Sequence, residues 1–132
     1  LAVAAQHPGA VVLGCDTVVD VNGEVFGKPH SVEDAKRMLR ALSGATHAVH
    51  TGVCVSDGKR TESFVDSCRV TFFPLSAAEI DFYASTQEPY DKAGAYAIQG
   101  RAALWLDRIE GDYYTIMGLP LSRTVQLLGH FL

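Results

Sequence analysis

One acidic residue stands where it could do chemistry. Asp16 follows the apolar run VVLGC, where a carboxylate contributes little to the stability of a buried strand. At the end of such a strand a carboxylate can take a proton from water or hold a divalent cation. The alternative is an aspartate that opens the Asn22-Gly23 turn or pairs with a nearby lysine. Asp16 is therefore the first candidate for a catalytic group.

Two lysines are placed in segments with a constrained backbone. Lys28 lies between Gly27 and Pro29, and Lys92 lies in the segment DKAG, whose small residues let the backbone come close to a ligand. A lysine is a compact point charge that suits phosphate. Both residues can instead be ordinary exposed lysines, as most lysines are. They are candidate anion contacts, and neither is decisive alone.

The other polar candidates differ in what they could do. Gln99 ends the segment AYAIQG, where its amide could read a base edge or a sugar, or bond to the loop backbone. Cys15 invites the hypothesis of a thiol nucleophile, but no histidine and acid accompany it, which favours a small buried residue. His47 and His50 are three apart on a predicted strand and face opposite sides, so they do not share a metal. The phosphate-binding patterns G-x-x-x-x-G-K-[ST] and G-x-G-x-x-G are both missing from the sequence.

Length and composition limit the classes of protein. The 132 residues suffice for one domain, 48% of them are apolar, and 11 basic against 15 acidic residues give a net charge of −4. This balance argues against binding to nucleic acid. The apolar runs are far shorter than the roughly 20 residues of a membrane span, and the start has no signal-peptide pattern, which predicts a soluble, cytoplasmic protein. Three cysteines without a ligand pattern predict buried free thiols rather than disulfides or a zinc site.

These candidates must be positioned by a series of strands and helices. Residues 10–21 are dense in β-branched side chains and predict a central strand covered on both faces, with a hairpin turn at Asn22-Gly23. Ser31 is the expected N-cap of a helix that ends at Gly44. Its apolar stripe consists of Ala35, Met38, Leu39 and Leu42. Residues 1–6 have the composition of the last turns of a helix.

The second half of the chain continues the series of strands and helices. A hairpin at Asp57-Gly58 joins residues 47–56 to residues 61–75, and Ser76 with Glu79 forms a capping box for a helix over residues 76–86. Residues 89–101 read as a functional loop, and residues 102–109 as a buried strand. The last helix covers residues 120–131, and we expect it to point Leu121, Val125, Leu128 and Phe131 inward. The order of elements predicts a single mixed α/β domain.

Five fragments of the sequence together resemble one protein family. They are GCDTVV, GKP, LSGATHAVHTGV, PYDKAGAYAIQG and IEGDYYTIMGLPL, in this order. The series is similar to the Maf family of nucleoside triphosphate pyrophosphatases over residues 11–128, and the D-T and I-Q pairs resemble the branch that acts on dTTP and UTP. The resemblance implies an α/β fold with a mixed sheet and flanking helices, like that of the inosine triphosphate pyrophosphatases, and a homodimer.

The resemblance also implies a role for each candidate. Asp16 would accept the proton of the attacking water, Lys28 and Lys92 would contact the triphosphate, and Thr17 and Gln99 would select the base. The implied reaction is hydrolysis between the α and β phosphates to a monophosphate and pyrophosphate, assisted by a divalent cation such as Mg²⁺ or Mn²⁺. The residues that hold this cation are not assigned.

Two departures from the family pattern leave an alternative open. Family members begin with a strand and a loop of the form S-x-S-P-R-R, whose arginines contact phosphate, and we expect residues 1–132 to form one Maf-like domain without that strand and loop. Cys15 also stands where the family usually has alanine. The first hypothesis is a pyrophosphatase acting on dTTP and UTP. The alternative is a catalytically inactive domain of the same fold that binds a nucleotide or a partner.

Overall fold

The first hairpin has the turn that its sequence predicts. The computed structural model describes residue 6 and residues 9–132, so residues 1–5 of the helix expected over 1–6 lie outside the described residues. Strand β1 (Val12–Val21) pairs antiparallel with β2 (Glu24–Phe26). Asn22 and Gly23 between them have φ of 52° and 87°. Two successive positive φ angles match the right-handed twist of the strands, and Asn-Gly adopts them at low cost.

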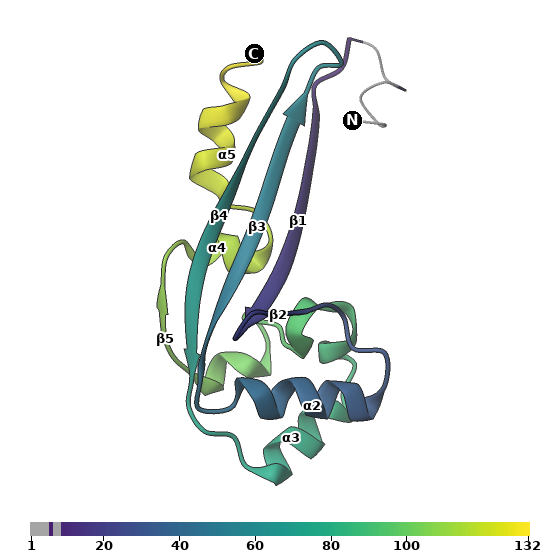
Figure 1. The fold of residues 1–132 in the computed structure, drawn as a ribbon, viewed down its shortest axis with the longest axis vertical. Coiled ribbons are helices and arrows are strands. Elements are labelled where there is room, and N and C mark those ends of the chain that lie inside the picture. The colour runs from purple at the N-terminus through teal and green to yellow at the C-terminus, as the bar shows by residue number, and fades with distance from the viewer. Residues whose placement is uncertain (1–5, 7–8) are drawn as a thin grey trace.

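A long second hairpin forms the centre of the sheet. Strand β3 (Thr46–Ser56) pairs with β4 (Thr61–Phe72), and β4 pairs with the short strand β5 (Leu106–Glu110). The strand order is β2-β1-β3-β4-β5. The predicted α/β class is confirmed, whereas the described sheet is antiparallel in every pairing rather than mixed. Figure 1 shows β1, β3 and β4 side by side along the length of the molecule.

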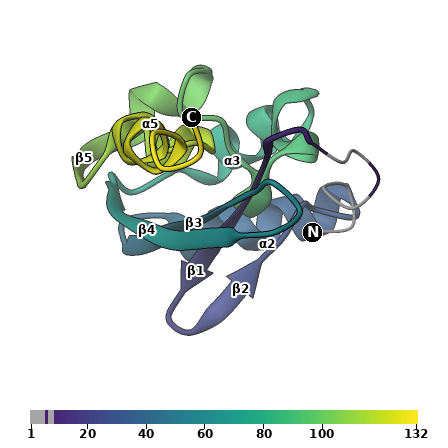
Figure 2. The same ribbon diagram turned by 90° about the horizontal axis from the view of Figure 1, so that it is seen from above.

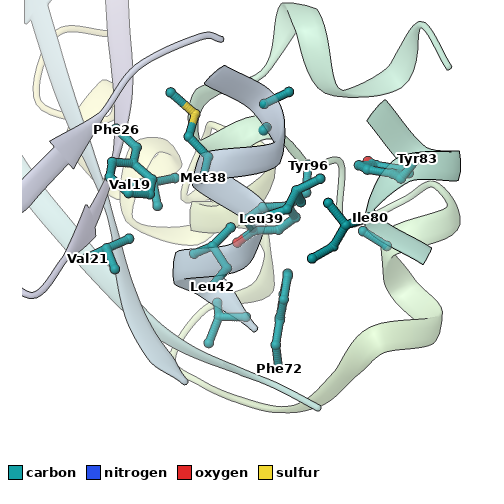
Figure 3. Packing of buried hydrophobic residues seen from close by; sticks show 14 of the residues in the cluster. Val19, Val21, Phe26, Met38, Leu39, Leu42, Phe72, Ile80, Tyr83 and Tyr96 are labelled. Carbon is teal, nitrogen blue, oxygen red and sulfur yellow. The ribbon is translucent and has the colours of Figure 1, made fainter. Parts of the chain in front are cut away.

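Helix α2 (Val32–Leu42) covers one end of this sheet. Ser31 Oγ accepts a hydrogen bond from the Asp34 N–H at 3.0 Å, and Gly44 follows the helix with φ 64°. The predicted cap, stop and apolar stripe are thus confirmed, since all four stripe residues are buried. Figure 3 shows Met38, Leu39 and Leu42 reaching from the helix into the main cluster of buried side chains.

The remaining helices lie along the second half of the chain. Helix α3 (Ala77–Ala84) has the predicted capping box, and three short 3-10 segments follow it: Glu88–Asp91, Ala93–Ala95 and Arg101–Trp105. Helices α4 (Tyr113–Met117) and α5 (Leu121–Leu128) complete the chain. Seen from above, α5 lies on one side of β3 and β4, and β2 extends toward the other (Figure 2). None of the described helices has the length and apolar character needed to cross a membrane.

One row of side chains on β3 contributes to two separate cores. Val49, Thr51, Val53 and Val55 alternate along the strand and are at most 1% exposed, as the sequence predicts for one face. Val49 belongs to the main cluster around α2, whereas Val53 and Val55 belong to a small cluster with Leu127 of α5. The sheet therefore carries its helices at both ends of the long hairpin.

Three of the sequence predictions about burial are wrong. Strand β1 is covered only near its end, at Val19 and Val21, while Leu13 is 40% exposed. β-branched residues predict the strand, but its cover depends on which elements pack there. The expected buried strand over residues 102–109 is a 3-10 turn followed by the half-exposed edge strand β5. The cysteines are free, yet only Cys68 is buried: Cys54 is intermediate, and Cys15 is exposed on the uncovered part of β1.

The C-terminal helices also differ from prediction. In α5 the buried side chains are Thr124 and Leu127, while Leu121 and Val125 are 46% and 57% exposed. Leu128 and Phe131 do pack on the small cluster as expected. The inward face is thus rotated relative to the predicted stripe. Helix α4 is not among the predicted elements. Its boundaries nevertheless carry the usual signals, since Asp112 caps its start and Gly118 follows its end with φ 113°.

Candidate active site

A pocket lies where the edge of β1 meets the loop after α3 and the end of α4. Its volume is about 270 Å³. Strand β1 contributes Asp16 and Thr17, and the loop contributes Lys92 and Gln99. The end of α4 contributes Met117, followed by its C-cap Gly118. Segments that are some 75 to 100 residues apart in sequence thus form one concave surface. Four of the five candidate site residues line it, and Lys28 is not among the described residues that do.

Strand geometry sends the two β1 residues in different directions. Thr17 and Thr51 are paired across β1 and β3, and their hydroxyl oxygens are 2.8 Å apart. Asp16 pairs with Gly52 and is exposed. Because side chains alternate along a strand, Asp16 points to the face opposite Thr17. It borders both this pocket and a shallow depression on the open face of the sheet, and no ion pair joins it to a lysine within the described ranges.

The loop of Lys92 and Gln99 is fixed at its start and at its end. The Tyr83 hydroxyl donates to the Glu88 carboxylate and accepts a hydrogen bond from the Ala97 N–H at 3.1 Å. Glu88 also accepts from the Arg101 N–H at 3.3 Å. Burial and the neighbouring carboxylate raise the pKa of Tyr83, so the phenol keeps the proton that it donates. A neutral tyrosine and one glutamate therefore hold the loop against α3.

A close backbone contact sets the middle of the same loop. Gly94 has φ 76°, its N–H donates to the Gly27 carbonyl at 3.1 Å, and a Cβ on it would lie 2.9 Å from Val19. Only glycine fits this conformation and this distance. The contact places Lys92 at the pocket and brings the loop against the segment of Lys28, which is exposed. The two lysines thus come from adjoining segments, one at the pocket and one beside it.

The pocket wall includes a buried aromatic ring. Tyr96 lines the pocket, is 5% exposed, and its hydroxyl lies 2.7 Å from His47 Nε2. Burial raises the pKa of Tyr96 and lowers the pKa of His47 to about 4, so both are neutral near pH 7. His50 lies on the opposite face, against Ser67 and Asp20, which confirms that the two histidines are not placed to share a metal.

The pocket lining includes carboxylates that could hold a divalent cation. Asp16 and Asp91 are the carboxylates of the pocket lining. The described residues hold no group of three or more histidine, cysteine or acidic side chains that could bind a metal by themselves. Mg²⁺ is commonly held by one or two carboxylates together with substrate phosphates and water, and this donor set fits such an ion.

Comparison with known proteins places the chain in a family. The family model described as Maf-like protein matches residues 1–131. The chain belongs to the Maf family. A Bacillus velezensis protein named dTTP/UTP pyrophosphatase is 50% identical over 130 residues, which are 98% of this chain and 69% of that protein. Proteins of the same name from Symbiobacterium thermophilum and Acholeplasma laidlawii are 52% and 49% identical, over 98% and 96% of this chain and 67% and 66% of theirs.

Several pocket residues of this Maf-family chain were not among the sequence candidates. Asp91, Tyr96, the α4 residues Ile116 and Met117, and Gly118 directly after α4 line the pocket. Thr51 lies directly behind Thr17 and is fully buried. A signal for Thr51 was present, because it is the only polar residue in the buried row Val49, Thr51, Val53, Val55. No local pattern marked the α4 residues as part of a pocket.

Proposed function

We propose that this protein hydrolyses pyrimidine nucleoside triphosphates, dTTP and UTP, to the monophosphate and pyrophosphate. The proposal is carried by one observation: Asp16, Thr17, Lys92 and Gln99, which the family resemblance marks as site residues, line a single pocket. It is supported by relatives about 50% identical that are named dTTP/UTP pyrophosphatase. Each of the four residues has a part in the proposed reaction.

Asp16 accepts a proton from a water molecule while the oxygen of that water attacks the α-phosphorus. A new bond forms between the water oxygen and the α-phosphorus, and the bond to the oxygen bridging the α and β phosphates breaks. Pyrophosphate leaves with that oxygen. Lys92, with Lys28 on the adjoining segment, offsets the negative charge of the triphosphate. Thr17 and Gln99 contact the base.

A divalent cation such as Mg²⁺ or Mn²⁺ is part of the proposal. Asp16 and Asp91 would hold it together with the substrate phosphates. When bound, such an ion neutralises charge on the phosphate oxygens. The proposal also includes the homodimer that the family resemblance implies, and analytical ultracentrifugation at micromolar concentration would test it, with a monomer as the contradicting result.

The direct test is pyrophosphate release from UTP and dTTP in the presence of Mg²⁺. Replacing Asp16 by asparagine should lower kcat about 100-fold or more, because general-base catalysis contributes a factor of this order. Asp107→Asn is a matched control, since Asp107 is an exposed carboxylate of β5 that lies outside the pocket lining. It should leave kcat unchanged.

The possible outcomes separate the two hypotheses. Wild-type turnover with an unchanged rate in Asp16→Asn would rule out the proposed role of Asp16. Nucleotide binding in calorimetry without release of pyrophosphate would favour the inactive binding domain. An absence of both binding and turnover would contradict the proposal as a whole.

A further inference from the structure

A chain of hydroxyl groups runs from the pocket into the interior. The Oγ1 atoms of Thr17 and Thr51 are 2.8 Å apart, and Thr51 Oγ1 lies 2.8 Å from the backbone carbonyl oxygen of Thr115. Thr51 and Thr115 are fully buried, whereas Thr17 lies at the pocket. The chain therefore connects a residue proposed to contact the base to Thr115, in the middle of α4.

The direction of these hydrogen bonds follows from counting protons. A hydroxyl has one proton to donate, and a carbonyl oxygen can only accept. Two oxygens at 2.8 Å without a proton between them would place lone pair against lone pair. The Thr51 hydroxyl must therefore donate its proton to the Thr115 carbonyl. It follows that the proton between Thr17 and Thr51 belongs to Thr17, which donates to Thr51. The single proton of Thr17 is directed inward, and only its lone pairs face the pocket.

A charged pair fixes the inner end of the chain. The Thr115 hydroxyl donates to Asp66, and Asp66 accepts from Arg123 Nη1 of α5 at 2.8 Å. The hydrogen bond from Thr115, with the Arg123 guanidinium, holds the pKa of Asp66 below its usual value, so the carboxylate keeps its charge. Helix α4 is thus tied to β4, and the Thr115 carbonyl cannot turn away from Thr51 at low cost.

We propose that Thr51 is a positioning residue that makes Thr17 a hydrogen-bond acceptor toward the substrate, so that the pocket selects the ring N–H at position 3 of uracil or thymine. In cytosine the ring nitrogen at position 3 carries no proton, so this acceptor would face the lone pairs of Thr17. This inference rests on the proposed function, because that function puts a pyrimidine nucleotide in the pocket. A sugar hydroxyl is the other group of a nucleotide that could donate to Thr17.

The test compares UTP with CTP in variants of Thr51. Thr51→Val removes the acceptor of the Thr17 proton and lets the Thr17 hydroxyl donate toward the pocket. The ratio of kcat/KM for UTP to that for CTP should fall about tenfold or more. Thr51→Ser keeps the hydroxyl and should keep the ratio. Thr124→Val is the matched control: Thr124 is also buried and donates to a backbone carbonyl, but it lies in α5 away from the pocket lining, so the ratio should not change.

Binding measurements keep this inference separate from the proposed function. The same ratios are measured by calorimetry with UTP, CTP and 2′,3′-dideoxy-UTP. Selective binding of UTP without pyrophosphate release would refute hydrolysis. The change that Thr51→Val causes in the ratio of UTP affinity to CTP affinity would still decide the inference. An equal loss of affinity or of kcat/KM for UTP and CTP in Thr51→Val would indicate a structural role only and would overturn the inference. A wild-type protein without preference for UTP over CTP would overturn it as well.

Two further results complete the test. If Thr51→Val does not fold, Thr17→Val removes the acceptor itself and should lower the ratio by the same factor, and an unchanged ratio there would overturn the inference. If Thr51→Val changes the preference for UTP over 2′,3′-dideoxy-UTP but not over CTP, Thr17 accepts from the sugar, and the selection of the base is refuted.

Discussion

His47 is a buried base whose neutral form is needed by the fold. Its side chain is 3% exposed and packs edge-on against Phe72 and Tyr96. Nε2 is hydrogen-bonded to the Tyr96 hydroxyl, whereas the buried Nδ1 has no partner among the residues described. Burial lowers the pKa of His47 to about 4, against 6.5 for an unperturbed histidine. A proton on His47 would thus place an uncompensated charge beside the pocket wall.

The lowered pKa of His47 predicts that the folded protein loses stability in acid. Between pH 6.5 and about 4 the unfolded chain binds a proton at His47 that the folded chain does not bind, so the free energy of unfolding falls as the pH is lowered through this window. The loss from this residue should reach roughly 3 kcal/mol near pH 4. Urea unfolding at several pH values measures it, as the difference between wild type and His47→Leu.

A matched variant isolates the effect. His30 is exposed, and His30→Gln should have the same pH dependence as the wild type. If His47→Leu lost stability between pH 6.5 and 4 as steeply as the wild type, the buried histidine would not be the cause.

At the scale of elements, α2 shows how a local signal stabilises a tertiary contact. Its cap pairs Ser31 Oγ with the Asp34 N–H, and the Asp34 carboxylate accepts from the His30 N–H at 3.0 Å. Asp34 also bonds to Arg37 within the same helix. The cap therefore fixes the start of the helix whose Leu39 and Leu42 are completely buried in the main cluster.

Removing the cap should weaken the whole fold by a modest amount. Ser31→Ala leaves the Asp34 N–H without its side-chain acceptor and should lower the free energy of unfolding by about 1 kcal/mol. Ser31→Asp keeps an acceptor at the same place and should lose much less. Urea midpoints of the three proteins give the comparison, and equal midpoints for Ser31→Ala and the wild type would contradict the role of the cap.

At the scale of the molecule, the two ends of the long hairpin have unequal cores. The main cluster gathers side chains of α2, α3 and the turns after α3, whereas the small cluster has only Val53, Val55 and Leu127 as buried members among the described residues. Figure 1 shows α2 and α3 at one end of the hairpin and α5 at the other. Leu127 is 9% exposed and Leu39 is completely buried. Since local stability follows the amount of buried apolar contact, α5 should open more readily than α2.

Hydrogen exchange followed by mass spectrometry tests this difference. Leu127→Ala should speed exchange mainly in α5 and in the adjoining parts of β3 and β4, with little change in α2. Leu39→Ala removes a side chain from the main cluster, should lower global stability by roughly 2–5 kcal/mol, and should speed exchange everywhere. Uniform acceleration in Leu127→Ala would show that the molecule opens as one unit.

The sequence by itself determined the features that depend on neighbouring residues. Turns at Asn22-Gly23 and Asp57-Gly58, the caps at Ser31 and Ser76, and the α2 stripe follow from local backbone preferences, and all are present. The candidates Asp16, Thr17, Lys92 and Gln99 were also found in the sequence, through their chemistry and the family resemblance, and they line one pocket.

Tertiary structure alone decided what covers each element and what meets at the site. The exposure of β1 at Leu13 and the inward face of α5 depend on long-range packing, which a local pattern does not contain. The same holds for α4 at the pocket. The direction of the Thr17 proton is set by Thr51 beside it and by the Thr115 carbonyl beside Thr51. These two residues lie 34 and 98 positions after Thr17 in the chain. Residue types can be read from sequence, but hydrogen-bond direction depends on which groups the fold brings together.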